Sequence, residues 1–190
     1  MVPRDTLRHI FGMSANFFAQ PLDTKKAMSW TTPEANRGYS AQGREKVTLV
    51  GATDVEEMRT SAPDLKESLE IGRDDDTAYE NHWPKEDGNI TGFKDDMLGF
   101  FELCKKMHIE VMRAIAVGMG LDETFFDQYL DVGDNTLRLL HYPSVEADVF
   151  KINPGQVRAG EHTVSKSTMY VNDILTCLVG LWFNHVVVPR

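Results

Sequence analysis

A change of hydrophobic period near residue 133 constrains the fold most strongly. Between residues 93 and 119, large apolar side chains recur at the three- and four-residue spacing of one helix face. These positions are Phe93, Met97, Phe100, Phe101, Cys104, Met107, Val111, Ile115 and Met119. Residues 136–142 instead form a short apolar run that ends at Pro143, which is typical of a strand. Helices first and strands second predict an α+β fold.

Shorter elements are expected on both sides of this long helix. Pro3 and Asp5 suit a helix start, and helix-spaced apolar residues, Phe11 among them, continue to Phe18. Gly118 and Gly120 end the long helix, and Asp122 begins a short helix through Tyr129. The remaining predictions are a short helix at 23–30, a loop or short strand at 31–47, a segment at 64–71 that is ambiguous between strand and helix, a surface segment at 73–92, and strands at 148–153 and 156–163.

Composition excludes several classes of protein. The length of 190 residues fits one domain, and the net charge of -9 argues against binding to nucleic acid or to an anionic membrane. Two cysteines, Cys104 and Cys177, give neither a disulfide framework nor a zinc-site spacing. Residues 1–10 carry three charged side chains where a signal peptide needs an apolar segment, so we expect a cytoplasmic protein.

The segment around His162 begins like an iron site. A non-haem Fe(II) centre commonly uses two histidines and one carboxylate. A His-x-Asp or His-x-Glu spacing on a strand places both side chains on one face, because strand side chains alternate with period two. Here His162 and Thr163 are followed by Val164, so the histidine is present and the acid is replaced.

Several stretches, in order along residues 3–163, resemble the isopenicillin N synthase-like 2-oxoglutarate/Fe(II)-dependent oxygenases, especially fungal members. The similar stretches are Phe17 to Leu22 with Lys25-Lys26, Arg37-Gly38-Tyr39 with Gly43 and Glu45, Asp64 to Ser68, Asn81 to Pro84, Leu137 to Pro143, and Ala159 to Thr163. Each stretch alone is weakly specific. Their shared order is what identifies the family.

The resemblance implies a helical N-terminal region packed on an incomplete double-stranded β-helix, or jelly roll. Residues 1–132 would be the helical region, 133–163 the first jelly-roll strands, and 164–190 a tail outside the family pattern, so that the chain reads as truncated at both ends. The family uses Fe(II), O2 and usually 2-oxoglutarate to hydroxylate, desaturate or cyclise a small organic substrate. Such a substrate, with no nucleic acid and no membrane, is therefore the expected partner.

Carried over residue by residue, the resemblance assigns two site residues. His162 matches the first metal ligand, and Tyr142 matches a tyrosine that approaches the 2-oxoglutarate carboxylate. Leu140 stands where many members have asparagine. The 28 residues after His162 contain no Arg-x-Ser carboxylate clamp, so this chain is expected to be catalytically compromised.

Two alternatives remain open. Asp173 and His185 could join His162 in a substitute metal site, although such residues on short tails are more often solvated. The foreign-looking tail could also arise from translation into an unspliced intron after Thr163. In place of an oxygenase, the chain could then be a non-catalytic remnant or interaction module that binds no iron.

Other polar residues have simpler structural interpretations. His141 is interpreted as a structural histidine, and Trp83 with Pro84 as a packing anchor. Asp74 to Asp76 are expected to form a solvated loop, because the remaining ligands of a calcium-binding loop are missing. Met97, Met107, Met112 and Met119 are interpreted as core residues, and Cys104 as a buried thiol.

Overall fold

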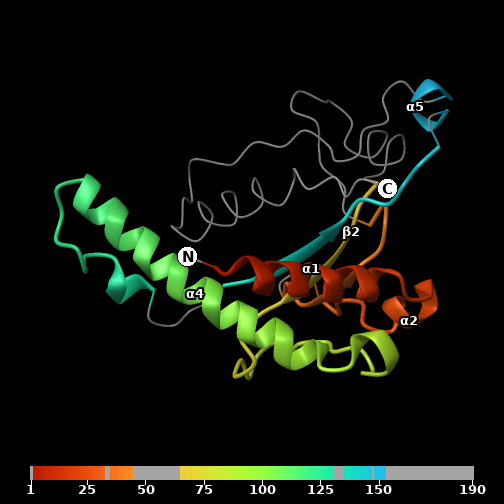
Figure 1. Cartoon of the computed structure of the whole chain (residues 1–190), viewed down its shortest axis with the longest axis horizontal. Coiled ribbons are helices and arrows are strands. Elements are labelled where there is room, and N and C mark those ends of the chain that lie inside the picture. Colours follow the sequence, from red (N-terminus) through yellow and green to blue (C-terminus); the bar gives the residue numbers. More distant parts are fainter. Residues whose placement is uncertain (1, 33–34, 45–64, 131–134, 147, 153–190) are drawn as a thin grey trace. The chain divides into compact units, whose positions relative to one another are not determined.

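A computed structural model describes residues 2–32, 35–44, 65–130, 135–146 and 148–152 (Figure 1). Its elements are α1 (Arg4–Phe18), α2 (Leu22–Lys26), β1 (Gly38–Ser40), β2 (Glu67–Ile71), the 3-10 helix η1 (Gly88–Ile90), α4 (Phe93–Gly118), the 3-10 helix η2 (Asp127–Tyr129), β3 (Leu137–His141) and α5 (Val149–Ile152). The three strands form one sheet in the order β1-β2-β3. The chain divides into two compact units, 1–38 with 70–137 and 39–69 with 138–190.

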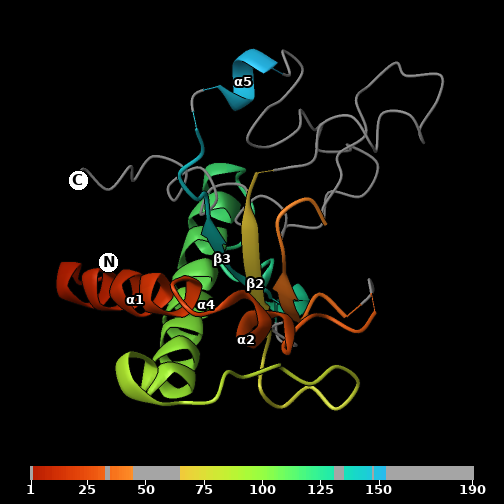
Figure 2. The ribbon, with the colours of Figure 1, turned by 90° about the vertical axis from the view of Figure 1, so that its right-hand side faces the viewer.

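Helix α1 begins directly after Pro3, whose extended backbone and missing N–H suit the position before a helix. Its buried residues are Ile10, Met13, Phe17 and Phe18. Phe17 stacks on Phe93 of α4 with ring centroids 5.4 Å apart, and α1 lies across α4 (Figure 2). Phe11, expected in the core, is 38% exposed, because the buried face contains Met13 instead.

The predicted face of α4 is correct as far as Phe101 and wrong beyond it. The positions buried in the second half of the helix are His108, Met112 and Ala116. Met119, expected in the core, is 64% exposed. Because two of the three buried positions hold a histidine and an alanine, a search for large apolar residues selects their neighbours instead.

Both ends of α4 have identifiable partners. At the start, the Glu86 carboxylate accepts the backbone N–H groups of Gly92 at 3.2 Å and Lys94 at 2.7 Å, which places a negative charge at the positive end of the helix. At the end, Gly120 has a φ of 73° and the Leu121 N–H donates to the Ala116 carbonyl at 2.9 Å. The glycines therefore end the helix as predicted.

The strand predictions have mixed outcomes. Residues 136–142 contain β3 as expected, and the ambiguous segment 64–71 contains β2. The strand predicted at 148–153 is wrong, because residues 149–152 form α5. A local turn, in which the Lys151 N–H donates to the Asp148 carbonyl at 3.0 Å, starts this short helix. The strand predicted at 156–163 lies outside the described residues.

The surface segment 73–92 is held by specific contacts. Asp75 is exposed, as a solvated loop requires, but the Asp76 side chain is only 10% exposed and pairs with Arg37 at 3.3 Å. Asp74 pairs with Lys94 at 2.9 Å, and Lys94 also lies over the Trp83 ring. The solvated-loop interpretation is therefore wrong for Asp76, whereas Trp83 anchors this segment as expected.

The glycine at position 38 is expected to be irreplaceable. Its φ is 105°, and an added Cβ would lie 2.5 Å from the Met28 carbonyl oxygen and 2.9 Å from the Trp30 nitrogen. Gly38→Ala should lower the free energy of unfolding by about 3 kcal/mol or more, since neither backbone neighbour can move cheaply. Gly99→Ala is the matched control, because Gly99 is exposed within α4 with nothing within 4 Å of the added Cβ. It should stabilise by about 0.5–1 kcal/mol in urea unfolding followed by circular dichroism. Equal effects of the two substitutions would contradict the structure.

Acid should destabilise the helical unit through His108. This side chain is buried, and burial lowers its pKa below the ordinary 6.5, against a smaller opposing effect of the hydrogen bond with Asn135. As the pH falls through 6.5, the unfolded state therefore takes up the proton first and stability is lost, by at most about 1.4 kcal/mol per pH unit. His108→Gln should flatten the stability profile between about pH 7 and pH 5. An unchanged slope in that variant would show that another group is responsible.

Candidate functional site

The two predicted site residues have different outcomes. Tyr142 is described and lies half-buried directly after the last residue of β3. His162 lies outside the described residues, as do Val164, Asp173 and His185. The predicted metal ligand therefore stays a prediction, and the structure instead describes the strand that leads to Tyr142.

Strand β3 has two different faces. Leu137 and Leu139 are buried, Arg138 between them is exposed, and Leu140 is half-buried. His141 belongs by alternation to the face of the buried leucines. The same alternation, continued by one residue, places Tyr142 on the face of Arg138 and Leu140.

A buried carboxylate holds the end of β3. Glu67, the first residue of β2, is 5% exposed and accepts a hydrogen bond from His141, with 2.8 Å between Oε1 and Nδ1. Its other oxygen, Oε2, accepts a short hydrogen bond from the hydroxyl of Tyr39, which is fully buried on β1. One residue from each strand therefore meets at a single carboxylate, and the structural interpretation of His141 agrees with this contact.

The electrostatics of this group keep the phenol neutral. Burial raises the pKa of Tyr39 well above its ordinary value, and the hydrogen bond and the negative charge of Glu67 raise it further. Tyr39 is consequently a hydrogen-bond donor at every physiological pH. It stabilises a buried charge that would otherwise be very unfavourable.

In the other unit, family-like stretches meet around two glycines. The Asn81 side chain makes a paired contact with the backbone of Gly72, accepting from its N–H at 2.8 Å and donating to its carbonyl at 2.9 Å. The buried Arg37 guanidinium lies so close to Gly72 that an added Cβ would overlap it. His82 bonds through Nδ1 to the Met28 carbonyl at 3.1 Å, beside Gly38. These contacts are structural, because each polar group is turned toward the protein's own backbone.

Sequence reasoning quoted Glu67 within a family-like stretch but gave it no role. A signal was available, because Glu67 and Glu70 alternate with Ser68, Leu69 and Ile71 in a strand whose five residues are all buried. Acidic residues in such a strand need partners, since an unpaired buried carboxylate is rarely tolerated. The partners themselves, Tyr39 and His141, lie too far away in sequence for any local pattern to reveal them.

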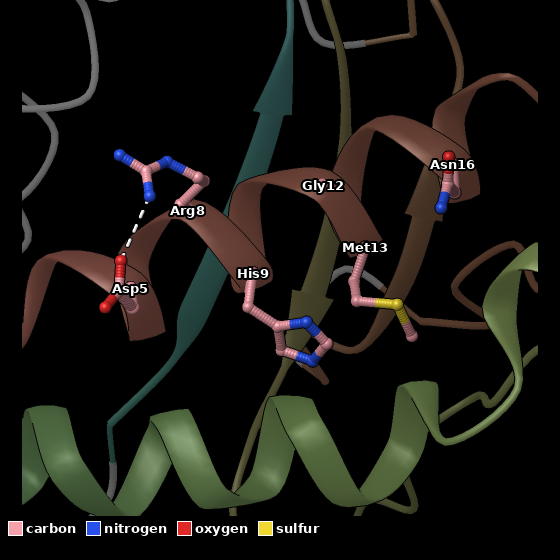
Figure 3. Close-up of a pocket in the computed structure, with 6 residues that line it drawn as sticks. All are labelled: Asp5, Arg8, His9, Gly12, Met13 and Asn16. Carbon is pink, nitrogen blue, oxygen red and sulfur yellow. Dashed lines mark hydrogen bonds and ion pairs between the residues drawn. The ribbon is translucent and has the colours of Figure 1, made fainter.

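An open hollow also lies along α1, lined by Asp5, Arg8, His9, Gly12, Met13 and Asn16 (Figure 3). Arg8 points away from α4 and pairs with Asp5 at 3.0 Å, and both side chains are largely exposed. His9 points toward α4, where its Nε2 lies 2.7 Å from Asp96. Its polar groups satisfy one another or a neighbouring helix, so they do not converge on a ligand.

Metal-ligand and membrane signals were also sought. Across the described part of the chain, no three side chains of His, Cys, Asp or Glu gather closely enough to hold a metal ion. None of the helices in that part is long and apolar enough to cross a membrane. The buried thiol of Cys104 has a pKa raised to about 11 by burial, so it is protonated and a weak ligand.

Known proteins share the order of these segments. A family described as the N-terminal region of non-haem dioxygenases in morphine synthesis matches residues 1–86. The 2-oxoglutarate-dependent dioxygenase htyE of Aspergillus rugulosus is 34% identical over 161 residues, which cover 84% of this chain and 48% of that protein. The 2-oxoglutarate-Fe(II) type oxidoreductase ppzD of Metarhizium rileyi is 37% identical, covering 84% and 45%.

A solved structure from Neurospora crassa, in complex with alpha-KG, agrees with a TM-score of 0.76 and 59% identity. The match covers 85% of this chain and 48% of that one. The chain belongs to the non-haem 2-oxoglutarate/Fe(II)-dependent dioxygenase family.

This dioxygenase chain spans about half the length of the relatives that it matches. A 2OG-Fe(II) oxygenase family protein from Caulobacter crescentus, 30% identical, also shares the fold, with a TM-score of 0.60 over 77% of this chain and 46% of that one. The α+β prediction is therefore confirmed. The helices and three-stranded sheet correspond to part of the family's jelly-roll fold.

Removing the hydroxyl of Tyr39 should expose the cost of the buried carboxylate. Tyr39→Phe leaves Glu67 with one donor fewer, so we expect the free energy of unfolding to fall by about 1.5–3 kcal/mol. Tyr129→Phe is the matched control, because Tyr129 is 65% exposed, and it should stay within about 0.5 kcal/mol of wild type. Urea unfolding measures both. A Tyr39→Phe value as small as the control would mean that the hydrogen bond contributes nothing.

Proposed function

We propose that this chain carries the N-terminal helical region and the first jelly-roll strands of an oxygenase that uses Fe(II), 2-oxoglutarate and O2 to oxidise a small organic substrate. Residues 1–132 would form the helical region, 133–163 the first strands and 164–190 a separate tail. The observation that carries the proposal is the 59% identity, over 85% of the chain, to the Neurospora crassa protein solved with alpha-KG.

The proposed site residues are Tyr142 for the 2-oxoglutarate carboxylate and His162 for the metal. Tyr142 fits this role because it is half-buried and follows a strand whose end is fixed by Glu67. The donor set around His162 fits Fe(II) incompletely, since Val164 supplies no oxygen ligand. Bound iron would supply the oxidation chemistry, and the protein would hold and orient the co-substrate.

A pyrimidine base is the substrate class that we propose. The Neurospora crassa protein has also been solved in complex with alpha-KG and thymine, at 59% identity, and with 5-formyluracil, at 53%. A planar base with fixed N–H and carbonyl groups needs a few directed polar partners in an otherwise apolar pocket. Arg138 and Tyr142, on the same face of β3, are candidates for such partners.

Iron binding tests the assignment of His162 directly. We expect wild-type chain to bind Fe(II) weakly in anaerobic equilibrium dialysis, because the His162-Thr163-Val164 stretch offers one donor instead of two. Val164→Asp adds a carboxylate at the strand spacing and should raise the affinity at least about tenfold. His162→Ala in the Val164→Asp background is the control and should remove the gain. A gain that survives this control would show that His162 is not the ligand.

Thymine-dependent consumption of 2-oxoglutarate tests the activity itself. The expected order is no turnover in His162→Ala, little in wild type and more in Val164→Asp. The second function, a non-catalytic module, is favoured by the replaced acid at Val164. Complete absence of iron and 2-oxoglutarate binding in every variant would support that function over an oxygenase.

A further inference from the structure

The carboxylate of Glu67 receives two hydrogen-bond donors from strands far apart in sequence. Tyr39, 28 residues earlier, donates from its hydroxyl to Oε2, and His141, 74 residues later, lies with Nδ1 2.8 Å from Oε1. An ionised carboxylate only accepts hydrogen bonds. Nδ1 of His141 must therefore carry the proton that lies between the two groups.

This contact fixes the identity of the imidazole tautomer. A neutral ring that carries its proton on Nδ1 has an unprotonated Nε2, so Glu67 determines which nitrogen is the donor. The His141 side chain is 42% exposed, whereas Glu67 is 5% exposed. The anchored edge of the ring is thus the buried one, and rotation of the ring would leave the carboxylate without a donor.

The position of His141 makes this anchor relevant to Tyr142. His141 is the last residue of β3, where ladder hydrogen bonds stop and strands fray most easily. Tyr142 follows it in the chain and, by alternation, leaves the backbone on the opposite face. A side chain fixed on one side of the strand end therefore restricts the backbone from which the next side chain projects.

We propose that Glu67 is a positioning residue, which fixes His141 as its Nδ1–H tautomer and thereby holds the end of β3 so that Tyr142 projects toward the 2-oxoglutarate site. The role given to Tyr142 rests on the proposed function. The anchoring of His141 and of the strand end does not. Glu67 itself touches neither co-substrate nor metal in this proposal.

Glu67→Gln tests the proposal with almost no change in volume. A glutamine offers one acceptor oxygen and one donor NH2, so it cannot accept from both Tyr39 and His141. In full-length chain with 15N-labelled histidine, the wild-type spectrum should show His141 protonated at Nδ1. In Glu67→Gln the proton should move to Nε2 in part or in full, and hydrogen exchange of the amides at 137–142 should become about tenfold faster or more.

Two further variants separate positioning from a general loss of stability. Tyr39→Phe removes the other donor and should leave the His141 tautomer unchanged, although it lowers stability. Glu102→Gln, at an exposed position of α4, should change neither the tautomer nor the exchange at 137–142. The ring signals of Tyr142, assigned with Tyr142→Phe, should shift in Glu67→Gln and stay unchanged in Glu102→Gln.

The proposal is overturned if Glu67→Gln retains the Nδ1–H tautomer, or if the Tyr142 ring signals do not move. Should Glu67→Gln fail to fold, the conservative Glu67→Asp and Tyr39→Phe are read instead. The tautomer must then follow the carboxylate and not the phenol. Calorimetric titration of wild-type chain with 2-oxoglutarate and Mn(II) tests the proposed function separately. A chain that binds no 2-oxoglutarate but shows all the spectral changes refutes that function and leaves the anchoring by Glu67 standing.

Discussion

The sheet depends on one carboxylate that cannot reach water. Glu67 is buried at the start of β2, and desolvation alone would make its charge prohibitive. The hydroxyl of Tyr39 and the imidazole of His141 compensate for this cost, and they come from the two neighbouring strands. Each strand therefore contributes one member, so a register shift in any strand would break the group. The polar cluster specifies a pairing that short strands of three and five residues could not specify by ladder bonds alone.

The same principle operates in the unit that contains the helices. Gly38 admits the Met28 carbonyl, and Gly72 admits the Arg37 guanidinium, because neither carries a Cβ. Arg37 also donates to the Ala35 carbonyl and pairs with Asp76, which ties the surface segment to the chain before β1. The stretches that identify the family are therefore those in which buried polar groups and close backbone approaches demand particular residue types. Apolar core positions tolerate exchange and are less informative.

The sequence predicts elements well where apolar spacing is unambiguous, and poorly where buried positions hold polar or small residues. The first half of α4 and all of β3 follow from their periods. The second half of α4 does not, because His108 and Ala116 occupy its buried face. Strand β2 is ambiguous in sequence since two of its five residues are glutamates. Residues 148–153 contain too few side chains for their period to distinguish strand from helix, and a local turn decides for α5. For the site, Tyr142 is found next to β3, whereas the role of Glu67 needs contacts across 74 residues.

Strand β3 illustrates how one element can combine a fixed and a variable side. Leu137, Leu139 and His141 share a face whose partners are the buried interior and Glu67, so their exchange would cost stability. Arg138, Leu140 and Tyr142 lie by alternation on the other face, and nothing in the Glu67 contact depends on their identity. Leu140 already departs from the family's usual asparagine without disturbing the anchored side. The physical separation of the two faces therefore lets substrate-facing residues change within a sheet whose pairing is held elsewhere. This separation is consistent with a family that keeps one fold while its members differ in the molecules that they oxidise.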